Sequence, residues 1–319
     1  MPSLLLVKTS SLGDVVHALP ALSDLARSGR AWTVHWMVEE AFACIPLLHP
    51  LTQRVVPVAT RRWRRDPASK STRADLCQVR QTVREFAPDL VLDLQGLLKS
   101  ALLARLSGGA LHGYDWQSAR EPLATLLYGH RHRVSWEQHA VARNRALTAA
   151  ALGSDDRLPC EYSVHYPERS ASAPEADAFA LLLHASSRDD KRWPDADWRT
   201  LGRALARGGV RCLLPAGSRA EADRAQAIAG DIPGARALAP GPLADLLPYF
   251  AQARLAVGVD TGLTHLAAAF GLPTVALFTA TDPAATGVFG SRRAVNLGGK
   301  GECPRVDQIL ATLEQLGAR

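Results

Sequence analysis

The sequence has few cysteines and no long apolar run, and both absences limit what the protein can be. Its 319 residues include only five cysteines, which are scattered and never form a CxxC pair. This spacing argues against a disulfide framework and against a zinc site. No stretch approaches the roughly 20 apolar residues of a membrane span, and the start, MPSLLLVK, lacks the features of a signal peptide. We therefore expect a cytoplasmic protein.

Several common motifs are also missing. The chain has neither a GxxxxGK[ST] loop nor a GxGxxG fingerprint, so ATPases and nicotinamide enzymes lose their main support. No helix-turn-helix, RNP or zinc pattern indicates a nucleic-acid reader. A single Asp-Thr-Gly follows an apolar run at 260–262, but an aspartic protease needs two such carboxylates, and here a helical pattern follows. No DxD-type pair of carboxylates is placed to hold a metal at a diphosphate.

The composition that remains is that of an ordinary globular protein. Hydrophobic residues make up 47% and charged residues 21%, and a chain of this length is expected to form two domains. The formal net charge is +6, from 37 Lys and Arg against 31 Asp and Glu. This excess suits an anionic partner such as nucleic acid, nucleotide or lipid phosphate, without choosing among them.

Short apolar runs alternate with helical stretches in both halves of the chain. This pattern predicts a mostly parallel sheet covered by helices on both faces. Strands are expected at 4–7, 33–38, 55–59, 90–95, 111–114, 132–136, 179–185, 211–217, 255–260, 274–278 and 294–298. Helices are expected at 75–86, 139–152, 195–207, 219–229, 243–252, 263–270 and 305–317.

A stretch rich in Pro, Ala and Ser, 167–178, separates the two halves and predicts a linker. The predicted fold class is therefore α/β, with two Rossmann-like domains, 1–166 and 179–319, and a central cleft. In such sheets, ligands bind beyond the carboxyl ends of the strands. The residues that directly follow strands are therefore the informative ones.

The first such loop contains the hydroxyls of Thr9, Ser10 and Ser11, then Gly13 and one acid, Asp14. Hydroxyls and backbone N–H groups at a helix N-terminus can bind an anion. A plain helix cap explains the same residues equally well. Pro20 is expected to break or restart the helix that begins near Asp14.

Two further loops lie in the second half. After strand 179–185, Ser186, Ser187 and Lys191 offer hydroxyls and a cation to a phosphate, although a solvated loop with an internal Lys–Asp pair is the plainer interpretation. After strand 255–260, Gly262 lets a ligand approach the backbone closely. His265 in the following helix is either a ligand-facing donor or a half-buried histidine with its own partners.

A fourth loop is RRWRR, 61–65, which is expected to follow strand 55–59 as a cationic patch around Trp63. Most charge runs are simply solvated faces. Arginine side chains nevertheless suit bidentate contacts with phosphate and carboxylate.

Taken in order, these stretches resemble the bacterial lipopolysaccharide core heptosyltransferases. The matching stretches are KTSSLGDVVHALPAL, WMVEEAFACIP, RRWRR, LDLQGLLKSALLARL, HGYDWQSAREPLA, HASSRDDKRWP and VDTGLTHLAAAFGLPT, which begin at residues 8, 36, 61, 92, 112, 184 and 259. They cover nearly the whole chain, and RRWRR with HGYDWQSAREPLA favours type I members over type II or later-acting ones.

The resemblance implies the GT-B fold, with the donor bound mainly by the C-terminal half and the last helix crossing back to the first domain. It implies transfer of heptose from ADP-L-glycero-β-D-manno-heptose to the inner Kdo of Kdo-lipid A. The reaction inverts the anomeric centre and needs no cofactor and no essential metal. A non-catalytic nucleotide-sugar or nucleic-acid binding protein is the alternative from another class.

The resemblance also implies roles for particular residues. Asp14 is the expected general base, and Lys191 neutralises the departing phosphate. The donor-binding residues it implies are Ser186, Ser187, Lys191, Glu221, Asp260, Thr261, Gly262 and His265. The acceptor-binding residues it implies are Ser10, Ser11, Gly13, Arg61, Arg62, Arg64, Arg65, Lys99 and Arg120.

Because the implied acceptor is a membrane lipid, the protein is expected to lie on the cytoplasmic face of the inner membrane as a peripheral protein, without binding nucleic acid. Trp63 beside the arginines is the expected interfacial contact.

Overall fold

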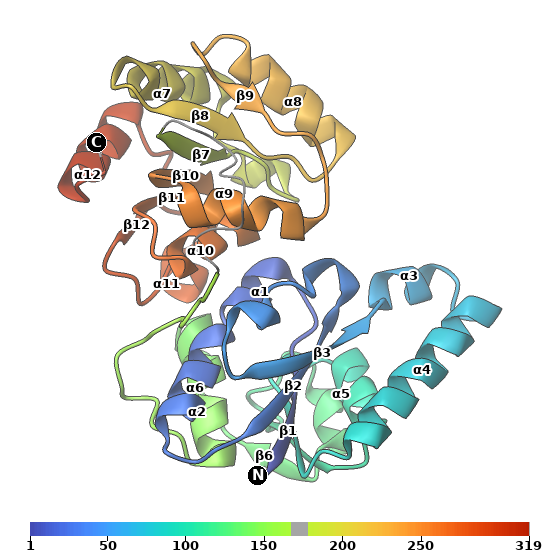
Figure 1. The fold of residues 1–319 in the computed structure, drawn as a ribbon. Coiled ribbons are helices and arrows are strands. Elements are labelled where there is room, and N and C mark those ends of the chain that lie inside the picture. The colour runs from blue at the N-terminus through green and yellow to red at the C-terminus, as the bar shows by residue number, and fades with distance from the viewer. Residues whose placement is uncertain (167–177, 319) are drawn as a thin grey trace. The chain divides into compact units, whose positions relative to one another are not determined.

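The computed structural model describes residues 1–166 and 178–318. These residues form two compact units, Met1–His165 and Tyr166–Arg319, and each unit has its own sheet (Figure 1). The predicted linker, 167–178, lies outside the described residues except for its last position.

The first unit is built on a six-stranded sheet in the order β3-β2-β1-β4-β5-β6. All five strand pairs are parallel. The strands are β1 (Ser3–Val7), β2 (Thr33–Glu39), β3 (Thr52–Val58), β4 (Leu90–Asp93), β5 (Ala110–Tyr114) and β6 (His130–His132).

Helices cover both faces of this sheet. They are α1 (Leu12–Val16), α2 (Leu19–Arg27), α3 (Thr60–Arg65), α4 (Lys70–Phe86), α5 (Leu98–Arg105) and α6 (Ala140–Leu152), with short 3-10 helices η1 (Glu40–Phe42), η2 (Pro46–Leu48) and η3 (Pro122–Leu127). Leu5 and Val7 of β1 share a core with residues of α3, α4, α5 and η3. Because side chains alternate along a strand, the other face is left for α2 and α6, which pack together (Figure 1).

The second unit repeats the plan with a parallel six-stranded sheet in the order β12-β11-β10-β7-β8-β9. Its strands are β7 (Phe179–Leu183), β8 (Arg211–Leu214), β9 (Arg236–Ala237), β10 (Leu255–Val259), β11 (Thr274–Phe278) and β12 (Ala294–Gly298). Its helices are η4 (Asp189–Lys191), α7 (Asp195–Arg207), α8 (Arg219–Ala229), η5 (Leu243–Leu246), α9 (Leu247–Gln252), α10 (Gly262–Ala269), α11 (Pro283–Thr286) and α12 (Val306–Gln315).

Each sheet contains one point where the order of the strands reverses. In the first unit, the chain builds outward from β1 to β3 and then returns to place β4 beside β1. In the second unit, it builds from β7 to β9 and returns to place β10 beside β7. Loops that leave the carboxyl ends of such neighbouring strands lie side by side, which is where α/β sheets bind ligands.

The α/β prediction is confirmed, but three details differ. RRWRR is not a loop, because residues 60–65 form helix α3. Strand β6 covers residues 130–132 and so begins two residues before the expected start at residue 132. Helix α12 was expected to cross back to the first domain, whereas it packs against α7 and β11 and buries Ile309 and Leu313 in the second unit's core.

Candidate active site

In the second unit, a cation and an acid from neighbouring strand ends meet. Lys191 follows β7, Asp260 follows β10, and Lys191 Nζ lies 2.6 Å from Asp260 Oδ2. Thr281 Oγ1 donates a hydrogen bond to the same oxygen at 2.6 Å. His265 Nε2 lies 3.8 Å from Asp260 Oδ1. Asp260 therefore organises three side chains from separate segments.

These contacts decide the ionisation of Asp260. Burial by itself would raise the pKa of this carboxyl group, but its contacts with His265, Lys191 and Thr281 outweigh burial and hold the pKa well below its usual range. Asp260 therefore stays charged at neutral pH. A charged Asp260 fixes the Lys191 ammonium group at the carboxyl edge of the sheet.

Helix α10 starts directly after Asp260 and is held tightly against β10. Thr264 Oγ1 donates to the carbonyl of Val259 at 2.7 Å. A Cβ on Gly258 would lie 2.1 Å from Thr264 Oγ1, so glycine is required for this approach. The first N–H groups of a helix have no partner within it. Thr264 N already donates to the carbonyl of Thr261 at 3.0 Å, so the N–H groups of Gly262 and Leu263 are the ones that can receive an anion near Lys191.

The other predicted donor residues lie at the same edge. Ser186 is buried and Ser187 is exposed in the loop after β7. Glu221 follows β8, which pairs with β7. One of its carboxylate oxygens, Oε2, accepts a hydrogen bond from Gly217 N at 2.7 Å, and its own N–H donates to the capping Ser218 Oγ at 3.3 Å.

In the first unit, the loop after β1 presents Asp14. Ser11 N donates to Asp14 Oδ2 at 2.7 Å and Ser11 Oγ donates to it at 3.1 Å. These bonds form a capping box at the start of α1. In the part of the chain that the structure describes, no hydrogen bond reaches the second oxygen, Oδ1. Asp14 is therefore oriented through one oxygen and can accept a proton on the other.

Residues of β4 and its loop fix the position of the Asp14 loop. Gln95 Oε1 accepts from Thr9 N at 3.0 Å and from Ser10 N at 3.3 Å. Sequence reasoning missed Gln95, although its place directly after a strand beside β1 was a signal for it.

A buried lysine, Lys8, lies at the end of β1, just before this loop. Lys8 Nζ donates to the carbonyl of Leu94 at 2.7 Å and to Asn144 Oδ1 at 3.4 Å. Burial lowers the pKa of Lys8, and the negative charges of Asp14 and Asp93 partly offset that effect. Lys8 therefore lies close enough to Asp14 and Asp93 for their charges to act on it.

Asp93, the last residue of β4, is completely buried. It accepts hydrogen bonds from Ser100 Oγ at 2.7 Å and from Tyr128 OH at 2.8 Å. Burial raises the pKa of this carboxyl group, and the hydrogen bonds from Ser100 and Tyr128 partly counter it. Asp93 ties α5 and the end of η3 to the strand that carries Gln95.

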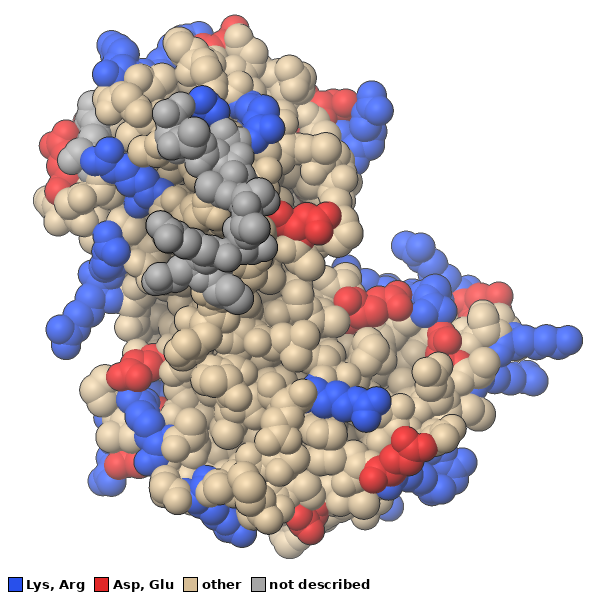
Figure 2. All heavy atoms as spheres, viewed as in Figure 1, with Lys and Arg blue, Asp and Glu red and all other residues tan. Residues whose placement is uncertain are grey.

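The predicted acceptor arginines lie on α3, whose surroundings form a basic region. Figure 2 shows several Lys and Arg residues over α3 and α4, with some Asp and Glu residues among them. Arg62 bonds to Asp75 at 2.7 Å and Glu40 at 3.3 Å. Arg64 and Arg65 are exposed, and within residues 1–166 and 178–318 no ion pair engages them.

Comparison with known proteins identifies the family. The profile of glycosyltransferase family 9 (heptosyltransferase) matches residues 76–311. Lipopolysaccharide heptosyltransferase 1 of Pseudomonas aeruginosa is 44% identical over 302 residues, which are 94% of this chain and 84% of that protein. The chain belongs to glycosyltransferase family 9.

Solved structures of a family 9 enzyme have the same fold. The structure of E. coli heptosyltransferase WaaC with ADP has a TM-score of 0.90 and is 37% identical, covering 98% of this chain and 99% of that one. The structure of the same enzyme with ADP-2-deoxy-2-fluoro heptose has a TM-score of 0.87 and is 38% identical, with the same coverage. The chain is therefore a transferase with the GT-B fold of its family.

One expected contact for this family 9 chain is wrong. Trp63 was expected to meet the membrane, but it is buried in the first unit's core. Its Nε1 donates to Asp75 Oδ2 at 2.8 Å. Because α3 is a helix, it turns Trp63 inward while its arginines stay outside.

Lys99 and Arg120 are both exposed. Lys99 lies on α5, near its start. Arg120 N lies close to Gly96, since a Cβ there would be 3.3 Å from it. Both cations therefore lie near the loop that follows β4.

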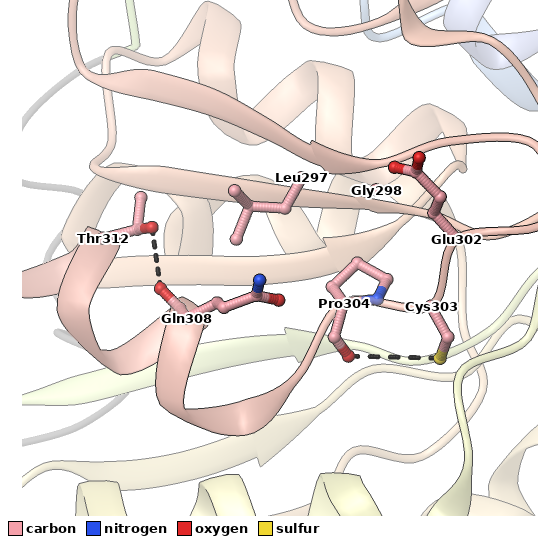
Figure 3. Close-up of a pocket in the computed structure, with 7 residues that line it drawn as sticks. All are labelled: Leu297, Gly298, Glu302, Cys303, Pro304, Gln308 and Thr312. Carbon is pink, nitrogen blue, oxygen red and sulfur yellow. Dashed lines mark hydrogen bonds between the residues drawn. The ribbon is translucent and has the colours of Figure 1, made fainter.

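A pocket of about 620 Å³ lies elsewhere in the second unit, between β12 and α12 (Figure 3). It is lined by Leu297, Gly298, Glu302, Cys303, Pro304, Gln308 and Thr312. This lining contains a carboxylate and no cation, so it does not suit a diphosphate. None of its residues was predicted to bind substrate.

Among residues 1–166 and 178–318, no three His, Cys, Asp or Glu side chains are grouped to hold a metal ion. Every helix described is too short or too polar to cross a bilayer.

Proposed function

We propose that this chain transfers L-glycero-D-manno-heptose from ADP-heptose to the inner Kdo of Kdo-lipid A, with inversion at the anomeric carbon. The observation that carries the proposal is that Asp260, two residues before the start of α10, holds Lys191 at 2.6 Å. Such an arrangement suits the diphosphate of a nucleotide sugar. Membership of the heptosyltransferase family and the two nucleotide-bound structures of one relative support this choice of donor.

On the donor side, the second unit stabilises the leaving group. As the bond between the anomeric carbon and the β-phosphate oxygen breaks, ADP keeps the electron pair and gains negative charge. Lys191, the hydroxyls of Ser186 and Ser187, and the N–H groups of Thr261 and Gly262 neutralise that charge. Donors already in place require little reorganisation during the reaction. These groups supply the role that a metal has in other transferases, and we propose that no metal is needed.

Two other donor roles follow from position. Glu221, at the start of α8, binds the ribose hydroxyls. Asp260 and His265 order the loop. The Asp260 carboxylate contacts both His265 and Lys191 and so fixes the lysine side chain.

On the acceptor side, Asp14 is the general base. It takes the proton of the acceptor hydroxyl as that oxygen forms its bond to the anomeric carbon. Its Oδ2 is held by Ser11, which leaves Oδ1 for the proton. Ser10, Ser11 and Gly13 shape the turn that presents it, and Gln95 holds that turn through Thr9 N and Ser10 N.

The acceptor is acidic, and the first unit carries cations to meet it. We assign the Kdo carboxylates and lipid A phosphates to the arginines of α3 and to two further cations near the Asp14 loop. These residues are Arg61, Arg62, Arg64, Arg65, Lys99 and Arg120. An acceptor of this kind lies in a membrane, so the protein works as a peripheral protein at the cytoplasmic face of the inner membrane.

Mass spectrometry of the product tests this function. The enzyme is given ADP-heptose with either Kdo-lipid A or an acceptor that already carries one heptose. Addition of one heptose to Kdo-lipid A alone is expected. Transfer only to the heptosylated acceptor would instead indicate a type II or later-acting enzyme, and ADP-heptose binding without turnover would indicate a binding protein.

A further inference from the structure

An exposed apolar surface lies on the first unit where α5 and η3 pack together. Leu98 is 38% exposed, Leu102 54%, Leu123 57% and Leu126 66%. Leu98 and Leu102 are four residues apart on α5, and Leu123 and Leu126 are three apart on a 3-10 helix. Each pair therefore shares one helix face. We call these four residues the leucine patch.

The fold does not need the leucine patch for its own core. The same two elements fill the core with other residues, namely Ala101, Leu103 and Ala104 of α5 and Ala124 of η3. Four leucines are therefore left exposed on two elements that pack together. Exposed apolar patches of this kind mark contacts with proteins, membranes or ligands.

The charges around the leucine patch indicate which partner it suits. Lys99 and Arg105 of α5 and Arg120, just before η3, are all exposed. The acid in this region, Glu121, accepts a hydrogen bond from Leu98 N at 2.7 Å and so satisfies the start of α5. Apolar side chains flanked by cations complement a bilayer with anionic headgroups.

The leucine patch also begins beside the Asp14 loop. Gln95, which binds Thr9 N and Ser10 N, precedes Leu98 by only three residues, a span of at most about 11 Å. At the other side, Glu121 N donates to the carbonyl of Gly96 at 3.0 Å. A surface at this place can meet the bilayer next to the site where a lipid acceptor reacts.

We propose that the leucine patch docks the protein on a bilayer that contains anionic lipids. Its leucines enter the boundary between headgroups and acyl chains, while Arg105 contacts headgroup phosphates and Lys99 and Arg120 contact the lipid acceptor at the edge of the patch. This inference rests on the proposed function, since a lipid-anchored acceptor has to reach Asp14 from a membrane. It assigns to α5 and η3 the contact that was first expected of Trp63.

Vesicle flotation tests the docking surface without any substrate. Vesicles of phosphatidylglycerol and phosphatidylcholine are compared with vesicles of phosphatidylcholine alone. Wild-type protein is expected to float with the anionic vesicles, and the double variant Leu102→Gln, Leu123→Gln to bind them at least about tenfold more weakly. The matched control is Leu47→Gln, because Leu47 of η2 is 56% exposed in the same unit and lies outside the leucine patch. It is expected to bind as wild type does.

Transfer assays separate docking from catalysis. With a water-soluble Kdo acceptor that lacks acyl chains, all three proteins are expected to transfer heptose at the same rate, which also shows that the variants fold. With Kdo-lipid A in vesicles, only the double variant is expected to be slowed.

Several results would overturn the docking proposal. They are absence of vesicle binding by wild type, binding by the double variant equal to that of wild type, an equal loss of binding in the Leu47→Gln control, and loss of transfer to the soluble acceptor in the double variant when wild type retains it. Light scattering that shows a wild-type dimer split by the double substitution would also overturn it, since the patch would then join two copies. A wild type that binds vesicles but transfers heptose to neither acceptor would disprove the proposed function alone.

Discussion

The two oxygens of Asp14 have different surroundings, and this difference allows a clean substitution. Asn in place of Asp14 can still accept the Ser11 N–H bond that now measures 2.7 Å, but it cannot take a proton. We expect Asp14→Asn to lower the turnover rate about 10²–10⁴-fold, the usual contribution of a positioned base.

Calorimetry and a transfer assay check this prediction together. The melting temperature and the affinity for ADP should stay as in wild type, because the donor residues belong to the other unit. A fall of less than severalfold in turnover with folding intact would show that Asp14 is not the base.

The stability of the fold is expected to depend on pH through one buried side chain, the imidazole ring of His49. Leu51 N donates to His49 Nδ1 at 3.1 Å, so Nδ1 carries no proton and Nε2 donates to Ser23 Oγ at 3.1 Å. Burial, together with the nearby charge of His165, lowers the pKa of His49 from 6.5 to about 4. Between these two pH values, the His49 ring therefore stays neutral in the folded state but is protonated in the unfolded chain.

This shift has a definite sign. Because the folded pKa is the lower one, the neutral ring contributes its stability above pH 6.5, and that stability is lost as the pH falls from 6.5 towards about 4. The difference corresponds to at most about 3 kcal/mol. Denaturant unfolding across this range should show a steeper loss in wild type than in His49→Asn. Parallel curves for the two proteins would contradict the prediction.

At the scale of elements, helix α3 carries two kinds of arginine: one that is already ion-paired and others that are exposed and available to a ligand. Arg62 is held by Asp75 and Glu40, whereas Arg64 and Arg65 are exposed. We expect the double variant Arg64→Gln, Arg65→Gln to raise the acceptor KM roughly three- to tenfold, the range for exposed ion pairs.

The donor KM of this double variant should not change, and Arg62→Gln should affect the acceptor KM less. Steady-state kinetics with each substrate varied in turn provide both constants. Equal increases in the two KM values would remove α3 from the acceptor site.

The approach of α10 to β10 supplies a second prediction for elements. In Gly258→Ala the new methyl group would lie 2.1 Å from Thr264 Oγ1 and 2.8 Å from Leu183 Cβ, so helix and strand must separate. We expect a loss of about 1–3 kcal/mol in unfolding free energy and weaker ADP binding, since the N-terminus of α10 moves with its helix.

The control for this change is Gly241→Ala in the same unit. There the nearest atom to a new Cβ, Asp245 Oδ2, lies at an ordinary 3.5 Å. Calorimetry and ADP titration of both variants measure the two effects. Unchanged ADP affinity in Gly258→Ala would show that α10 does not form the donor site.

Strand ends could be predicted from the sequence because buried parallel strands are continuous apolar runs, and polar residues such as Asp260 mark where they stop. Helix α3 could not be predicted, because its buried face consists of Trp63 among four arginines, and a single apolar position shows no helical periodicity. The contact between Lys8 and Asn144 joins residues 136 positions apart, and only the folded chain brings them together. Strand β9 has two residues, too few for any periodicity.

At the scale of the whole molecule, the division into Met1–His165 and Tyr166–Arg319 predicts where a nucleotide changes the dynamics. All residues that we assign to the donor lie in the second unit. A ligand that binds only the folded state stabilises it against every opening that breaks the binding site, by about 2.7 kcal/mol when the ligand concentration is 100 times its Kd. Hydrogen exchange with saturating ADP should therefore slow in the loops after β7 and β8 and at the start of α10. The interiors of β1, β2 and β4 should exchange as they do without ADP.

The pocket beside α12 in the second unit serves as the internal control, because hydrogen exchange of its lining from Leu297 to Thr312 should stay unchanged. Protection at that pocket, or protection in the first unit's sheet alone, would show that the nucleotide binds somewhere other than at Lys191.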